Sequence, residues 1–256
     1  MARDRRDIYY WRAKEEGYRS RAAFKLLQIN QKFSIIKEGD TVVDLGAAPG
    51  GWLEVAKKLS GGKVIGVDLQ RISPIEGVET IKGDITSEAT INKILKLVGE
   101  EGADTVICDA APNLSGSWNY DHGRSVDLAK SALQCAAKIL KPGGNFTVKV
   151  FQGDLFKNYL DEVSNNFTYT KSFSPVASRS QSAEIYVVAK NFIKAPVRKG
   201  QEFDVEITSE GSNGDGVVKI QDFVIFVKGA NKGEKVMIKI KDVKPNFAFA
   251  DVVTRC

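Results

Sequence analysis

Three charged residues lie at the ends of short apolar runs that have the composition of buried strands. Asp109 and Lys149 each follow such a run, and Glu184 opens a third. A charged group there needs a partner, because an isolated buried ion costs several kcal/mol. A structural ion pair between Lys149 and one of the acids would meet this need. A neutral lysine could instead act as a base, although an unperturbed lysine, with a pKa of about 10.4, is almost wholly charged at neutral pH.

The segment 41–52, TVVDLGAAPGGW, has the pattern of a strand, a tight loop and the start of a helix. Such a loop presents backbone N–H groups to a ligand at a helix N-terminus. Glycine is needed where the backbone must come close to that ligand, so Gly46, Gly50 and Gly51 indicate where a side chain would be in the way. The loop differs from the dinucleotide fingerprint G-x-G-x-x-G because Ala48 takes its second glycine position, which makes NAD the weaker interpretation.

Acidic residues follow three successive predicted strands. They are Asp44, Asp68 and Asp84. A lone aspartate at a strand end is as readily an N-cap or a loop carboxylate. Three in succession favour a ligand site, because an acid at the position of Asp68 typically binds the ribose hydroxyls of an adenosine.

The loop DLGAAPGGW resembles the cofactor loop of the FtsJ family of S-adenosylmethionine-dependent ribose 2′-O-methyltransferases of ribosomal RNA. The segment 20–26, SRAAFKL, resembles the N-terminal catalytic motif of that family, although by spacing alone Lys25 would be an exposed helix lysine. The resemblance covers roughly residues 1–192. It implies methylation of a uridine ribose in 23S-type large-subunit rRNA, with rRNA or the large ribosomal subunit as partner.

The same resemblance implies roles for individual residues. The family's Lys-Asp-Lys-Glu catalytic set falls on four positions of this chain, which are Lys25, Asp109, Lys149 and Glu184. S-adenosylmethionine is expected along Gly46 and Gly50 with Trp52 beside it, Asp68 at its ribose, Asp84 near its adenine and Asp109 near its reactive methyl and amino end. No metal is implied, and no His, Cys or Asp ligand spacing indicates one.

Strands and helices alternate through the first three quarters of the chain, which predicts a Rossmann-like, doubly wound α/β sheet. The expected strands are 41–45, 63–67, 78–82, 104–108, 144–150, 167–173 and 184–190. The expected helices are 8–18, one from Ser20 as N-cap, 51–60, 88–98, 123–140 (ended by 141–144) and 153–164. Ligands bind at the carboxyl ends of the strands of such sheets, where the acids and Lys149 lie.

The last quarter of the chain changes character. Alternating segments at 201–207, 217–220, 223–227, 234–241 and 246–253, with a glycine-rich turn at 211–216, predict five short strands in a small barrel. Segments 216–219 and 222–230 resemble a TRAM domain, an OB-like RNA-binding module whose attachment to an FtsJ-type enzyme looks like an archaeal arrangement. We expect a methyltransferase domain at 1–192 and a TRAM domain at 193–256, joined near 191–197.

Positive charge is concentrated at the start of the chain. Residues 1–37 carry ten Lys or Arg against four Asp or Glu, whereas 38–192 carry sixteen against nineteen. A solvated basic helix would explain this, but arginines interleaved with Tyr9, Tyr10, Trp11 and Tyr18 also suit phosphate contacts and base stacking. RNA is favoured over a membrane as partner because no apolar stripe accompanies the charge.

The remaining composition indicates an ordinary globular protein of a reducing compartment. Hydrophobic residues make up 43% and charged residues 27% of the 256 residues. The three unclustered cysteines, Cys108, Cys135 and Cys256, indicate neither a disulfide framework nor zinc. With no signal peptide or membrane-spanning run, we expect a cytoplasmic protein, and a monomer.

Two alternatives stay open at this point. A tRNA or another RNA could supply the ribose. A non-catalytic RNA-binding factor of ribosome assembly could keep the fold, but it would have no need for a lysine within a buried strand.

Overall fold

The computed structural model describes residues 8–179, 182–211 and 213–255, and the chain divides between Phe192 and Ile193 into two compact units. Cys256, the basic residues 1–7 of the predicted arm, and Ser180 and Gln181 lie outside the described residues. No described helix is long and apolar enough to cross a membrane.

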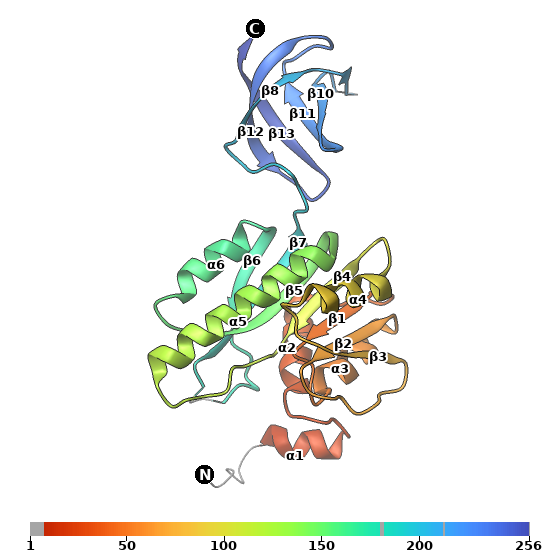
Figure 1. The fold of residues 1–256 in the computed structure, drawn as a ribbon, viewed down its shortest axis with the longest axis vertical. Coiled ribbons are helices and arrows are strands. Elements are labelled where there is room, and N and C mark those ends of the chain that lie inside the picture. The colour runs from red at the N-terminus through yellow and green to blue at the C-terminus, as the bar shows by residue number, and fades with distance from the viewer. Residues whose placement is uncertain (1–7, 180–181, 212, 256) are drawn as a thin grey trace. The chain divides into compact units, whose positions relative to one another are not determined.

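The first unit is built around a seven-stranded sheet in the order β3-β2-β1-β4-β5-β7-β6 (Figure 1). Its strands are β1 (Val42–Leu45), β2 (Val64–Asp68), β3 (Val78–Lys82), β4 (Ala103–Cys108), β5 (Leu140–Phe151), β6 (Phe167–Phe173) and β7 (Glu184–Phe192). Strands β1 to β5 run parallel, whereas β7 is antiparallel to both β5 and β6. The strand order reverses between β1 and β4, which is where an open α/β sheet binds its ligand. The predicted doubly wound sheet is confirmed.

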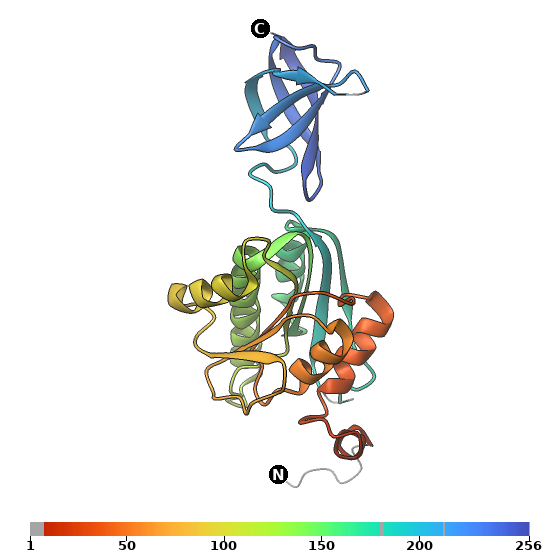
Figure 2. The same cartoon turned by 90° about the vertical axis from the view of Figure 1, so that its right-hand side faces the viewer.

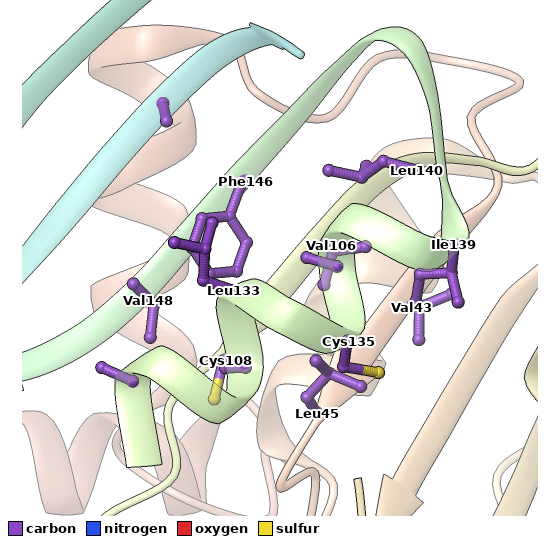
Figure 3. Close-up of a cluster of buried hydrophobic side chains, with 14 of the residues drawn as sticks. Val43, Leu45, Val106, Cys108, Leu133, Cys135, Ile139, Leu140, Phe146 and Val148 are labelled. Carbon is purple, nitrogen blue, oxygen red and sulfur yellow. The ribbon is translucent and has the colours of Figure 1, made fainter. Parts of the chain in front are cut away.

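Helices cover both faces of this sheet (Figure 2). They are α2 (Ala23–Phe33), α3 (Gly51–Ser60), α4 (Glu88–Val98), α5 (Trp118–Ile139) and α6 (Phe156–Ser164), whereas α1 (Ile8–Glu15) packs on α2. One core lies between the sheet and the helices α4, α5 and α6, with Val106, Phe146 and Val148 facing Leu133 of α5 (Figure 3). A second core lies between the other face and the helices α2 and α3. Parallel strands covered in this way must be apolar on both sides, which explains their continuous apolar runs.

Two helix starts differ from the prediction. Helix α2 begins at Ala23, three residues after Ser20, and no side chain caps it. Ser20 instead packs against the start of α3, where its Oγ would lie 2.2 Å from a Cβ added to Gly51. Helix α5 begins at Trp118, before the predicted residue 123, because the Asp121 carboxylate accepts hydrogen bonds from the loop ahead of it and Gly123 is an ordinary helical residue.

Other boundaries move by a few residues. Helix α1 ends at Glu15, because Gly17 has a positive φ of 78°. Helix α5 ends at Ile139, and the predicted stop at 141–144 is already part of β5.

The second unit is a curled sheet in the order β8-β12-β13-β11-β10-β9, with its own apolar core. Its strands are β8 (Glu202–Glu206), β9 (Ser209–Glu210), β10 (Gly216–Ile220), β11 (Phe223–Lys228), β12 (Lys235–Val243) and β13 (Phe247–Arg255). The described part contains six strands, one more than predicted. The extra strand β9 is only two residues long, too short to produce an alternating pattern in the sequence.

Candidate active site

Two ion pairs lie at the carboxyl ends of β4 and β5. The Lys149 ammonium contacts Asp109 twice, donating to its backbone carbonyl at 2.6 Å and lying 3.0 Å from its Oδ1. Lys25 of α2 pairs with Glu184 of β7 at 2.5 Å. The structure therefore brings together the four residues that the family motif indicates, and it shows which acid pairs with which lysine.

Tyr186 connects the two ion pairs. It lies opposite Lys149 in the register of β5 and β7, and its hydroxyl donates to Asp109 Oδ1 at 2.5 Å. The Lys25 ammonium lies 5.8 Å from the centre of the Tyr186 ring. Sequence reasoning missed this tyrosine, although residues two apart on a strand share a face and Tyr186 is two residues beyond Glu184.

Burial controls the ionisation of this cluster. It raises the pKa of the Tyr186 phenol well above its usual value, and the nearby Asp109 and Glu184 charges add to the effect, so the phenol stays a donor. Burial would also raise the pKa of Glu184, but the charge and hydrogen bond of Lys25, together with smaller effects of Ser178 and Lys149, outweigh it, and the net shift is downward. The site thus holds two carboxylates and two lysines with no net formal charge.

The loop that contains Gly46, Gly50 and Gly51, called the glycine loop below, is held by side chains from two other segments. The Asp68 carboxylate at the end of β2 accepts the N–H of Ala48 at 2.9 Å and that of Gln70 at 2.7 Å. Arg19 donates to the carbonyls of Pro49, Ser73 and Pro74, and its guanidinium pairs with Glu54 of α3 at 3.1 Å. Sequence reasoning missed Arg19, because its partners are backbone carbonyls that no side-chain pattern reveals.

The glycines of this loop have protein neighbours. Gly46 has a φ of 75°, and a Cβ there would lie 2.4 Å from that of Ala110. A Cβ on Gly50, whose φ is 112°, would meet Ile75 at 2.9 Å. Ala110 and Ser20 of this chain thus each leave no room for a side chain, at Gly46 and at Gly51 respectively. Whether Gly46 and Gly50 also line a cofactor stays a prediction.

Three carboxylates gather at the adjacent ends of β1, β2 and β4. Asp44 is 1% exposed, and among the described residues neither of its oxygens has a hydrogen-bond partner. Burial raises its pKa well above the usual value, and the charges of Asp109 and Asp68 raise it further. A cation placed beside these three acids would favour the ionised form of Asp44.

The other two expected cofactor residues differ in exposure. Trp52 is 3% exposed, donates to the Ala22 carbonyl at 2.8 Å and stacks on Tyr186 at 5.8 Å between ring centres. Asp84 is exposed, and its carboxylate accepts hydrogen bonds from the backbone and hydroxyl of Thr86, which lower its pKa. The roles of Trp52 and Asp84 at a cofactor stay predictions. Within the described residues no three His, Cys, Asp or Glu side chains are placed to hold a metal ion.

The aromatic residues near the N-terminus are mostly packed inward. Tyr9 and Tyr18 lie 5.4 and 5.8 Å from the ring of Phe24, between ring centres. Trp11 is 50% exposed. Tyr9 of α1 and Tyr18, which follows α1, therefore pack against α2, whereas Trp11 is exposed. A role of this segment in RNA binding stays a prediction.

Comparison with known proteins adds family information. The family described as FtsJ-like methyltransferase matches residues 18–192, and the TRAM domain matches residues 196–253. A Methanosarcina mazei protein named ribosomal RNA large subunit methyltransferase E is 71% identical over 255 residues, covering 100% of this chain and 95% of its own length. A Methanococcoides burtonii protein of the same name is 67% identical over 256 residues, covering 100% and 96%.

A solved structure supports the fold of the first unit. A Plasmodium falciparum protein described as a ribosomal RNA methyltransferase superposes with a TM-score of 0.63 at 29% identity, covering 68% of this chain and 98% of its own.

Proposed function

Because the chain belongs to the family of FtsJ-like methyltransferases, we propose that it methylates the ribose 2′-hydroxyl of a uridine in large-subunit ribosomal RNA. Relatives that match this chain over its full length are named for large-subunit rRNA. The uridine and the 2′-hydroxyl are what the resemblance to the FtsJ family implies, and the four charged residues match that family's catalytic set.

The observation that carries the proposal is the geometry at the Lys149 nitrogen. A lysine nitrogen has three positions for hydrogens, and Asp109 contacts two of them through its carbonyl and its carboxylate. Among the described residues no other partner takes the third position. We assign it to the 2′-oxygen: in the reacting form Lys149 is neutral, its two hydrogens are donated to the carbonyl and carboxylate of Asp109, and its lone pair takes the proton that the 2′-hydroxyl loses as its oxygen attacks.

The neighbouring residues hold Lys149 in this orientation. Tyr186 donates to the same Asp109 oxygen that Lys149 contacts, so the carboxylate is fixed from two directions. Lys25 and Glu184 form the second pair and compensate each other's charge. A largely buried site whose charged groups are held in place is suited to a reaction in which a cation reacts with an alcohol, because its dipoles are arranged beforehand.

The carboxylate cluster fits S-adenosylmethionine, which when bound supplies a methyl group on a positively charged sulfur. Asp44 and Asp109 would face that positive charge, and the N–H groups of the glycine loop lie at the start of α3. We assign Asp68 to the ribose hydroxyls, Asp84 to the adenine side, and Gly46, Gly50 and Trp52 to the methionine portion.

We assign RNA affinity to the basic N-terminal segment and to the C-terminal unit. In the latter, Phe226, Phe247 and Phe249 form a cluster with ring centres 5.3 to 5.9 Å apart, and Phe249 is 41% exposed. Exposed aromatic rings on a small barrel are suited to stacking with bases.

Mass mapping of methylated nucleotides in cells that lack the gene tests this function. We expect one 2′-O-methyluridine to disappear from large-subunit rRNA, to return with the wild-type gene and to stay absent with Lys149→Ala. Loss of a tRNA methylation instead would contradict the substrate. Normal ribosome assembly with restored methylation in the Lys149→Ala strain would contradict the catalytic role of Lys149.

A further inference from the structure

Large apolar side chains are exposed around the start of α5. Leu114 is 68% exposed, Trp118 50%, Tyr120 59% and Leu155 46%. They come from the loop after β4, from the first turn of α5 and from the loop after β5. Exposed large apolar residues that gather in one region commonly mark a binding site.

The plane of Trp118 is held by two other rings. Its ring lies 6.0 Å from that of His122 with an interplanar angle of 15°, and 6.2 Å from that of Phe151 with an angle of 20°. His122 is buried, and a Cβ on Gly153 would lie 2.7 Å from its ring, so the chain after β5 passes close to it. Trp118 is thus half exposed, and its ring is held nearly parallel to the rings of His122 and Phe151.

The loops on both sides are tied to α5. The Asp121 carboxylate accepts the N–H groups of Ser115 and Gly116 at 2.8 and 3.1 Å, in addition to the Ser115 hydroxyl. His122 Nε2 accepts the Leu155 N–H at 3.2 Å. These bonds fix the surface before any ligand arrives, which lowers the ordering cost of binding.

This surface adjoins the proposed catalytic centre. Phe151 lies two residues beyond Lys149 on β5, roughly 7 Å along the strand. Arg124, one turn beyond Tyr120 on α5, lies 5.5 Å from the Tyr120 ring and donates to the Asn113 carbonyl at 3.0 Å. A guanidinium has five N–H donors, so donors beyond that bond can reach a phosphate.

We propose that Trp118, backed by His122 and Phe151, is a stacking platform for an unpaired base next to the methylated nucleotide, with Arg124 on the adjoining phosphate. This inference rests on the proposed function, because it takes an RNA ribose to lie at Lys149. RNA is the occupant that the charge and position favour: aromatic rings beside an arginine suit a base and its phosphate, and single-stranded bases are the ones exposed for stacking.

The test uses the full-length protein and an rRNA fragment centred on the uridine found by mass mapping. We expect Trp118→Ala to weaken RNA binding roughly 5- to 100-fold and to raise KM similarly, with kcat and cofactor affinity nearly unchanged. Trp118→Phe should keep most of the affinity. Tyr169→Ala, which removes a 40% exposed aromatic from β6, is the matched control and should have no effect. Equal melting temperatures would exclude misfolding.

Abasic substitutions identify the stacked base. One flanking abasic nucleotide should weaken wild-type binding by the same factor as Trp118→Ala, and the two losses should not add in the double change. Unchanged RNA affinity in Trp118→Ala, or additive losses at every flanking position, would overturn the platform even if methylation occurs as proposed. If instead an oligouridylate binds with Trp118-dependent affinity while no ribose is methylated, the proposed function fails and the platform stands.

Discussion

At the scale of single residues, the two lysines of the site differ in the partners that hold them. Lys25 forms an ion pair with a carboxylate from another element and lies under 10% exposed, whereas Lys149 is anchored by the main chain and side chain of one residue. The orientation of the Lys149 side chain is therefore set by Asp109, at the carboxyl end of β4. We expect substitutions there to affect chemistry and those at Lys25 to affect both chemistry and the packing of α2.

For Lys149→Ala we expect methyl transfer to be abolished while both substrates still bind. Lys149→Arg should fail as well, because a guanidinium stays protonated and cannot accept the proton of the 2′-hydroxyl. Single-turnover rates across pH provide the measurement. Substantial activity in Lys149→Arg would contradict proton transfer to Lys149 and favour electrostatic positioning of the hydroxyl.

The burial of Asp44 predicts that the stability of the cofactor-free protein depends on pH. Its native pKa lies above the unfolded value of 3.8, chiefly through burial. The native state therefore holds a proton that the unfolded state releases, and stability is lost as pH rises from about 4 through the native pKa. Relative to the wild type, Asp44→Asn should gain unfolding free energy over this range, by at most about 1.4 kcal/mol per pH unit. Urea unfolding from pH 4 to 8 would show it, and a difference independent of pH would contradict it.

At the scale of elements, the site is assembled where loops from neighbouring strand ends are tied to one another. The loop between β1 and α3 is held by Asp68 from the end of β2 and by Arg19 from the segment before α2. If one carboxylate both orders this loop and binds the ligand, its removal should change the order of the loop and the affinity for the ligand together. Asp68 is the residue at which this coupling can be measured.

We expect Asp68→Ala to weaken S-adenosylmethionine binding by about 1.5–3 kcal/mol, the contribution of a hydrogen bond to a charged group. Titration calorimetry measures the affinity. A melting curve of the cofactor-free variant measures the stability that is lost when Asp68 no longer holds the loop. Asp127→Ala, at an exposed position of α5, is the control. Unchanged affinity would contradict the assignment of Asp68 to the ribose.

At the scale of the whole molecule, the two units have separate apolar cores, one set within residues 9–192 and the other within 195–252. Removal of residues 193–256 should therefore leave the first unit folded and cofactor binding unchanged. RNA binding should weaken, and its salt dependence should flatten, because each phosphate contact on a single strand contributes about 0.7 to the slope of log K against log salt. An unchanged slope would mean that the C-terminal unit has no role in RNA binding.

The sequence alone determined the sheet, its strand ends and the segments that carry charge there. Continuous apolar runs, such as the one that ends at Asp44, are what a strand buried on both faces requires, and the glycine loop predicts a strand followed by a helix. The assignment of Lys25 needed the family resemblance, because a lysine on a helix is usually exposed.

Only the tertiary structure decided how these groups pair. Which acid faces Lys149, that Tyr186 joins the two pairs, and that Trp118 stacks over Phe151 depend on contacts between elements far apart in the chain. The inward packing of Tyr9 and the role of Ser20 against Gly51 are of the same kind. Periodicity predicts the face of an element on which a residue lies, but the partner across that face is set by how the helices and strands pack together.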